Sequence, residues 1–193
     1  KAYSYFNTGD YENSAVQFAS YIKENPKNKR LSDAKLRLAD SYFGSKNYSA
    51  ASRVYQELFS ADAKLSTDPY ARYQYAQALY KSGKTNEAIN EFKSIQQNFP
   101  NSEYAEVSLY TIGWIHFQKK EYTQSIAQYN FVVSKYPQTK LEPIIYYSIG
   151  DAQFNMEKYD SAIVNYEKVL SQFPSSPYVF DAVTGIQYSY VAK

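Results

Sequence analysis

Apolar positions recur along this chain at helical spacing, and the pattern repeats at a step of 37 residues, the interval from Tyr122 to Tyr159. The register of large aromatic residues contains Phe18, Tyr55, Phe92, Tyr129 and Tyr166, and a register of small residues contains Ala2, Ala39, Ala76, Gly113 and Gly150. A closing proline recurs at Pro26, Pro100, Pro137 and Pro174, with Ala63 as the exception. Registers that stay in step over the whole chain predict a repeat architecture.

Each repeat contains two segments with the periodicity of an amphipathic helix. In the fifth repeat, apolar residues follow one helix face from Tyr146 to Phe154, and a second stripe starts at Ala162 after a turn at Asn155–Lys158. Pro174 then ends the second helix, because proline lacks a backbone N–H and restricts the residue before it.

Residues that favour helix N-termini stand where the pattern needs them. Asp68 and Ser176 each precede a proline, which suits the first position of a helix, so both are predicted to begin first helices. Asp10 and Thr85 are predicted N-caps of second helices.

The small residues explain how the two segments of a repeat pack. Two helices approach to roughly 8–10 Å only where the side chains at their crossing are small. One pair cannot bury its apolar face alone, so successive pairs stack and share a core. The sequence therefore predicts an all-α solenoid of antiparallel helix pairs in one array. The predicted units are 1–31 (repeat 1, first helix truncated), 32–68 (repeat 2), 69–105 (repeat 3), 106–142 (repeat 4), 143–179 (repeat 5) and 180–193 (terminal helix of repeat 6).

These registers resemble the tetratricopeptide repeat (TPR), and the resemblance covers essentially the whole chain. The fourth repeat supplies the family pattern with Leu109, Ile112, Gly113, Phe117, Tyr122, Ser125, Tyr129 and Pro137. The resemblance implies a right-handed α-solenoid whose first helices line a concave face that binds other proteins.

Two features depart from the usual repeat. The step of 37 residues exceeds the usual period of about 34, and long linkers of this kind resemble a subgroup found in bacterial envelope proteins. That subgroup includes the outer-membrane assembly lipoprotein and the periplasmic coordinator associated with the Tol–Pal system. Repeat 2 lacks its closing proline, so we expect a looser junction or a longer helix there.

Composition narrows the functional classes. The chain has 21 basic and 19 acidic residues, no cysteine and one histidine, and it carries no catalytic or phosphate-binding motif. We therefore expect no enzyme activity, no cofactor and no metal, and the register of His116 indicates packing.

The balanced charge indicates no nucleic-acid partner. No segment is apolar enough to insert into a membrane. The start at Lys1, in what reads as mid-helix, indicates a piece of a longer protein.

Candidate partner-binding residues follow from the resemblance, register by register along the first helices. They are Asp40, Tyr70, Tyr73, Gln77, Tyr110, Trp114, Tyr147 and Asp151. Tyrosine and tryptophan suit recognition because they bury a large area with few rotamers and keep a polar group. The alternative is that these aromatics pack between repeats, and we favour packing for the register from Phe6 to Phe154. Trp114 is expected to be exposed in the groove.

The sequence thus favours a non-enzymatic scaffold that binds a peptide or helix of a partner protein within a bacterial envelope complex. The expected location is the periplasm or the outer membrane, with the cytoplasm as the alternative. One alternative function is a structural module that self-associates through the ends of the array. Another is an accessory TPR domain of an enzyme or a sensor.

Overall fold

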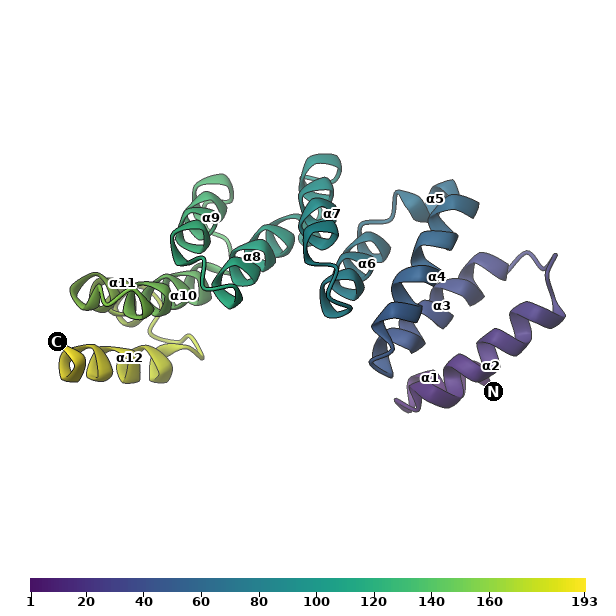
Figure 1. Ribbon diagram of the computed structural model, residues 1–193, viewed down its shortest axis with the longest axis horizontal. Coiled ribbons are helices and arrows are strands. Elements are labelled where there is room, and N and C mark those ends of the chain that lie inside the picture. The colour runs from purple at the N-terminus through teal and green to yellow at the C-terminus, as the bar shows by residue number, and fades with distance from the viewer. The chain divides into compact units, whose positions relative to one another are not determined.

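A computed structural model describes residues 1–193, and every regular element in it is an α-helix (Figure 1). The chain divides into two compact units, Lys1–Phe99 and Pro100–Lys193. The first unit contains α1 (Ala2–Asn7), α2 (Tyr11–Glu24), α3 (Leu31–Gly44), α4 (Tyr48–Ala61), α5 (Ala63–Ser66), α6 (Pro69–Lys81) and α7 (Thr85–Asn98). The second contains α8 (Glu103–Gln118), α9 (Tyr122–Lys135), α10 (Glu142–Asn155), α11 (Tyr159–Gln172) and α12 (Val179–Ala192).

The helices form the predicted pairs. The complete pairs are α3 with α4, α6 with α7, α8 with α9 and α10 with α11. Most first helices begin within a residue of the predicted repeat boundary, but α8 already begins at Glu103. The prediction of an all-α architecture of stacked helix pairs is confirmed.

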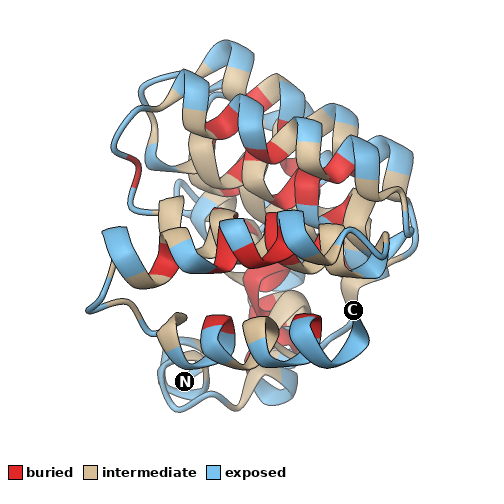
Figure 2. Cartoon of the chain, turned by 90° about the vertical axis from the view of Figure 1, so that its left-hand side faces the viewer, coloured by how far each residue is buried: buried red, intermediate tan, exposed pale blue.

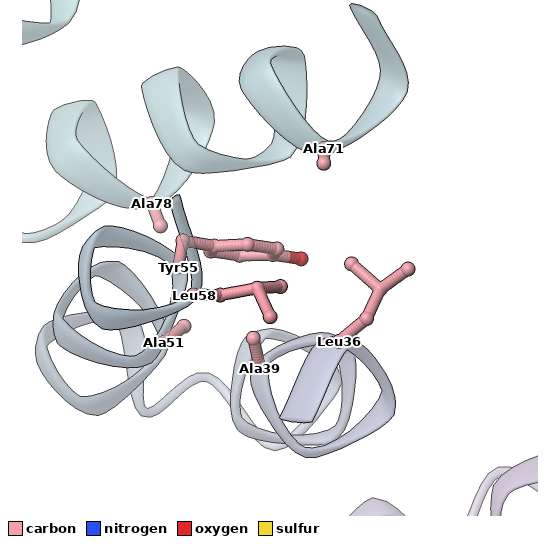
Figure 3. Close-up of a cluster of buried hydrophobic side chains, with 7 residues drawn as sticks. All are labelled: Leu36, Ala39, Ala51, Tyr55, Leu58, Ala71 and Ala78. Atoms are coloured by element: carbon pink, nitrogen blue, oxygen red, sulfur yellow. The ribbon is translucent and has the colours of Figure 1, made fainter. Parts of the chain in front are cut away.

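Packing within the first unit joins one pair to the first helix of the next pair. In Figure 3, Tyr55 and Leu58 of α4 lie between α6 above and α3 below. The cluster consists of Leu36, Ala39, Ala51, Tyr55, Leu58, Ala71 and Ala78. In the longer helices, buried residues alternate with exposed ones along the ribbon (Figure 2), as expected when stacked pairs share a core; α1 and α5 contain no buried residue.

The small-residue register lies where two helices of a pair touch. A Cβ atom added at Gly113 would lie 2.6 Å from the ring of Tyr129, and one added at Gly150 would lie 2.5 Å from the ring of Tyr166. These glycines therefore let the first helix approach the aromatic ring of the second helix, which confirms the predicted role of this register.

The turns between paired helices share one backbone conformation. The turn residues Gly9, Lys46, Gly83, Lys120 and Glu157 follow the step of 37 residues, and all five have a positive φ between 60° and 87°. In each turn the next residue donates a backbone hydrogen bond to a carbonyl five residues earlier, as Asn47 does to Tyr42 at 2.8 Å. Such a left-handed residue closes a helix C-terminus and satisfies its last carbonyl groups.

Helix starts agree with the sequence in part. The Asp10 carboxylate caps α2 by accepting a hydrogen bond from the backbone N–H of Asn13 at 3.2 Å. Asp68 caps α6, as predicted, by accepting from the backbone N–H of Tyr70. The prediction for Thr85 is wrong, because Lys84 is the cap residue of α7 and no side chain caps that helix. Ser176 stands before the last helix, but α12 begins only at Val179.

The junction after repeat 2 contains a short additional helix rather than a longer second helix. The second helix of this repeat, α4, has 14 residues like α2 and α7, so it is not longer. A separate helix, α5, follows it, and the Asp62 carboxylate caps α5 by accepting from the backbone N–H groups of Lys64 and Leu65. The short helix α5 thus begins at Ala63, the position that holds the closing proline in the other repeats.

Candidate partner-binding surface

Asp40, on the first helix of repeat 2, is buried and fully engaged within the repeat. The Tyr55 hydroxyl donates to its Oδ1 at 2.5 Å, and the Arg37 guanidinium pairs with its Oδ2 at 2.9 Å. Burial raises the pKa of Asp40, while the hydrogen bond from Tyr55 and the charge of Arg37 act in the opposite direction. The carboxylate therefore holds α3 to α4 and presents little surface to a ligand.

The other candidate residues of the first unit are also tied to neighbours. The Gln77 amide donates to the Tyr73 hydroxyl at 2.8 Å, and the ring of Tyr73 packs on Phe92 at 5.8 Å between centroids. The Tyr70 hydroxyl accepts from Gln74 at 3.3 Å and interacts with Asp40. These residues form internal contacts and leave only part of each side chain exposed.

The four candidate residues of the second unit come together around one pocket. Tyr110 and Trp114 of α8 lie beside Tyr147 and Asp151 of α10, and the pocket between them has a volume of about 160 Å³. Its remaining walls come from Phe117, Tyr129, Ile144, Ser148 and Tyr178. The structure thus brings this half of the predicted set into a single site.

Aromatic stacking supports the walls of this pocket. Tyr110 packs on Tyr129 with 5.4 Å between ring centroids, and Tyr147 packs on Tyr166 at 5.8 Å. Tyr147 also stacks on Tyr178 at 6.0 Å. Trp114 is 38% exposed, more than any other residue around the pocket. The walls are therefore held in place by rings of the same unit, while one large ring remains open to solvent.

Asp151 is a largely buried carboxylate at the edge of the pocket. The Tyr166 hydroxyl donates to its Oδ1 at 2.7 Å, but no lysine, arginine or histidine forms a salt bridge with it. Burial raises the pKa of Asp151, and the nearby Asp181 carboxylate adds to this effect, whereas hydrogen bonds from Tyr166 and Tyr147 oppose it. Asp151 is thus a carboxyl group without a basic partner.

Tyr129 is fully buried, and its hydroxyl forms no hydrogen bond of good geometry, although the Ser125 and Ser148 hydroxyls lie close to it. The residues at the same register, Tyr55 and Tyr166, each donate to an aspartate of the first helix. In repeat 4, Trp114 occupies the position that holds aspartate in repeats 2 and 5. The Ser125 hydroxyl donates its proton to the Gly113 carbonyl at 2.8 Å, so it does not donate to Tyr129. The substitution of a carboxylate by an indole leaves the Tyr129 hydroxyl without its carboxylate partner.

Sequence reasoning missed Tyr129, Ser148 and Tyr178 as lining residues. The sequence did contain a signal for Tyr129. In repeats 2 and 5 the tyrosine at this register is accompanied by an aspartate on the first helix, whereas in repeat 4 the aspartate is replaced by Trp114. Ser148 and Tyr178 lie outside the registers carried over from the family pattern, so that pattern could not indicate them.

The surroundings offer little other chemistry. His116 is partly buried, and its Nδ1 lies 2.7 Å from Oε2 of Glu121. No group of three histidine, cysteine, aspartate or glutamate side chains could hold a metal ion. None of the twelve helices has the length and apolar character needed to cross a membrane.

Solved structures with the same fold define the class of protein. The C-terminal part of a TPR protein from Cytophaga hutchinsonii matches 99% of this chain and 69% of its own, with a TM-score of 0.79 and 18% identity. A TPR protein from Parabacteroides merdae matches 100% of this chain and 70% of its own, with a TM-score of 0.75 and 14% identity. A TPR protein from Thermus thermophilus matches 98% of this chain and 95% of its own, with a TM-score of 0.57 and 16% identity.

The chain is therefore a tetratricopeptide-repeat protein in its fold. It belongs to the YfiO family, described as outer membrane lipoprotein, because residues 65–189, more than half of its length, match the model of that family. The resemblance to bacterial envelope TPR proteins is thus confirmed. No curated protein gives a significant match to the sequence.

Proposed function

We propose that this protein is a non-enzymatic scaffold that binds a segment of a partner protein along its first helices. The pocket between α8 and α10 carries the proposal, because it combines an exposed tryptophan, tyrosines held by stacking and one unpaired carboxylate. Aromatic residues of this kind are common at the energetic centres of protein interfaces. Asp40 serves this function indirectly, by holding the helix pair of repeat 2 together.

The partner complex belongs, in this proposal, to the bacterial cell envelope. The support is the family description, outer membrane lipoprotein. The expected location is the periplasmic side of the outer membrane.

The Trp114→Asp substitution tests the pocket without disturbing the fold. An aspartate here recreates the Asp–Tyr pair of repeats 2 and 5, because the free Tyr129 hydroxyl can donate to it. We expect the melting temperature of this variant to equal or exceed that of the wild type. We also expect the amount of cross-linked partner protein, recovered from the native host and measured by mass spectrometry, to fall strongly.

The matched control is Phe131→Asp, on the second helix of the same repeat. Phe131 is 46% exposed, compared with 38% for Trp114, so both substitutions remove an exposed aromatic ring and add a charge. The control variant should recover the same partner as the wild type. If the Trp114→Asp variant also recovers that partner in full, the pocket is not the binding site.

A specific observation favours self-association as a second function. Phe180, Tyr190 and Val191 of α12 are 79%, 62% and 86% exposed. Exposed apolar side chains on one helix can stack on a second copy of the chain. Sedimentation over a range of protein concentrations should then show a growing mass, which the double substitution Phe180→Ser and Val191→Ser should abolish. A constant monomer mass would exclude this function.

A further inference from the structure

The first unit contains an internal precedent for what the pocket can bind. In repeat 2 the Arg37 guanidinium pairs with Asp40 at 2.9 Å, and its central carbon lies 5.8 Å from the ring centroid of Phe6 on α1. The guanidinium is thus held between a buried carboxylate and an aromatic ring of the preceding repeat. Its side chain remains 32% exposed, so this place opens to solvent.

The same registers recur three repeat periods later, in the second unit. Phe117 stands at the register of Phe6, Asp151 at that of Asp40, and Ser148 at that of Arg37. All three residues line the pocket of about 160 Å³. The carboxylate and the aromatic ring are therefore retained, while the cation between them is replaced by a small hydroxyl residue.

Two polar groups in this pocket lack the partners that their equivalents have. Asp151 forms no salt bridge, although Asp40 forms one. The Tyr129 hydroxyl is buried without a hydrogen bond, which costs about 1–3 kcal/mol in a protein interior. A ligand that donates hydrogen bonds and carries positive charge would pair with Asp151, which is only partly buried, whereas the Tyr129 hydroxyl lies beneath the surface.

The pocket has room for one planar group. A cavity of about 150 Å³ holds a single benzene ring, and a guanidinium group with its adjacent methylene groups is of similar size. The face of an aromatic ring attracts a cation placed over it, and Trp114 is the exposed ring of this pocket. An apolar side chain would fill the volume but leave Asp151 without a cation.

We propose that this pocket binds an arginine side chain of the partner protein, in the place that Arg37 occupies in repeat 2. This inference rests on the proposed function, since the arginine belongs to the segment that the scaffold binds. Arginine suits the site better than lysine, because its planar guanidinium both stacks on rings and donates several hydrogen bonds in one plane.

Trp114 provides the readout for a direct test, because it is the only tryptophan in the chain and lines the pocket. The probe is N-acetyl-arginine methylamide, titrated into the whole protein while the indole N–H signal of Trp114 is followed by NMR. The control probe contains citrulline, which has nearly the same shape without the charge. We expect saturable shifts with arginine and binding at least about tenfold weaker with citrulline.

The Ser148→Arg substitution tests the assigned place from within the chain. An arginine here should pair with Asp151 as Arg37 pairs with Asp40, so the variant should keep or raise its melting temperature and lose binding of the arginine probe. The matched control is Gln74→Arg in repeat 3, where Gln77 replaces the aspartate. This control should neither gain stability from a new ion pair nor change probe binding.

The outcomes separate this inference from the proposed function. Equal binding of the two probes, absence of binding, or full binding to the Ser148→Arg variant would each overturn the arginine assignment. The scaffold function would still stand if Trp114→Asp abolished partner recovery. In the reverse case, if the pocket bound arginine selectively but Trp114→Asp left partner recovery unchanged, both the scaffold function at this site and the assignment of the arginine to the partner would be overturned.

Discussion

At the scale of single residues, three tyrosines at one register have different surroundings. Tyr55 and Tyr166 donate to the carboxylates of Asp40 and Asp151, at 2.5 Å and 2.7 Å. Tyr129 is equally buried, but its hydroxyl has no carboxylate partner and forms no hydrogen bond of good geometry. A hydrogen bond to a charged group contributes about 1.5–3 kcal/mol to stability, whereas an unsatisfied buried hydroxyl lowers stability by about 1–3 kcal/mol.

Substitution by phenylalanine should therefore have opposite effects at two of these positions. Tyr129→Phe removes an unsatisfied hydroxyl and should leave the free energy of unfolding unchanged or raise it by about 1 kcal/mol. Tyr166→Phe removes a charge-assisted hydrogen bond and should lower it by about 2 kcal/mol. Urea unfolding followed by circular dichroism measures both values. Loss of stability of the same size in both variants would contradict the assigned difference.

At the scale of helices, the closest contact within a pair joins a glycine to a tyrosine ring. The Cβ of an alanine at position 113 would lie 2.6 Å from Tyr129, closer than two carbon atoms can approach without a shift. The ring also packs against Tyr110, one turn earlier on the same helix as Gly113, at 5.4 Å between centroids, so its freedom to shift is limited.

The Gly113→Ala substitution should destabilise the protein although alanine favours helices. Alanine gains about 1 kcal/mol over glycine in helix propensity, but forcing an extra methyl group into a packed core costs about 1–3 kcal/mol or more. We expect a net loss of about 1 kcal/mol in thermal or urea unfolding. In the Tyr129→Leu background, which removes the ring, the same alanine should become neutral or stabilising. An unchanged loss in that background would show that the ring is not the cause.

The five turns within the helix pairs are equivalent elements with different residues. Lys46, Lys120 and Glu157 adopt the positive φ that Gly9 and Gly83 adopt at the same register. The left-handed conformation costs a residue with a Cβ atom roughly 1–2 kcal/mol, and glycine avoids most of this cost.

Replacing a lysine or glutamate at this register with glycine should raise the free energy of unfolding, and the reverse replacement should lower it. Each of Lys46→Gly, Lys120→Gly and Glu157→Gly should raise the free energy of unfolding by about 0.5–1 kcal/mol. Gly83→Lys, the reverse change, should lower it by a similar amount. Melting temperatures of the four variants provide the measurement. A lower melting temperature for the glycine variants would mean that the lysine and glutamate side chains contribute more than their strain.

At the scale of the whole molecule, the chain contains two units with separate cores. The clusters around Tyr55 and around Phe18 lie within Lys1–Phe99, and the cluster around Tyr166 lies within Pro100–Lys193. The pocket of about 160 Å³ is formed by residues of the second unit alone. Both units have the size at which domains commonly fold alone.

We therefore expect the fragments 1–99 and 100–193 to fold independently. Each should give a helical circular dichroism spectrum and a cooperative thermal transition, because each retains its own buried cluster. A matched control is a cut inside a unit, after Asp62, which separates Tyr55 from Ala71 and Ala78 and should leave unstable fragments. A fragment 100–193 without a cooperative transition would show that its core is insufficient.

The sequence predicted the repeat architecture well because periodicity depends only on local spacing. The helix pairs, the glycine positions and the caps at Asp10 and Asp68 follow from that spacing and from residue type. The cap position of α7, Lys84, was missed, since all five turns have one geometry and that turn rather than the type of residue fixes which residue precedes the helix.

The candidate site could be predicted only in part. Register placed Tyr110, Trp114, Tyr147 and Asp151 on first helices, and these residues do surround one pocket. Register could not show that Asp40 is neutralised by Arg37, or that Ser148 leaves space beside Asp151, because both facts depend on contacts between side chains.

The register of Asp40, Trp114 and Asp151 has a consequence for the design of such arrays. Asp40 and Asp151 accept a hydrogen bond from the tyrosine of the second helix, whereas Trp114 is exposed and leaves Tyr129 without that bond. One position in each first helix can therefore either join the two helices of a pair or present a side chain to another molecule, while the helix pair around it stays the same.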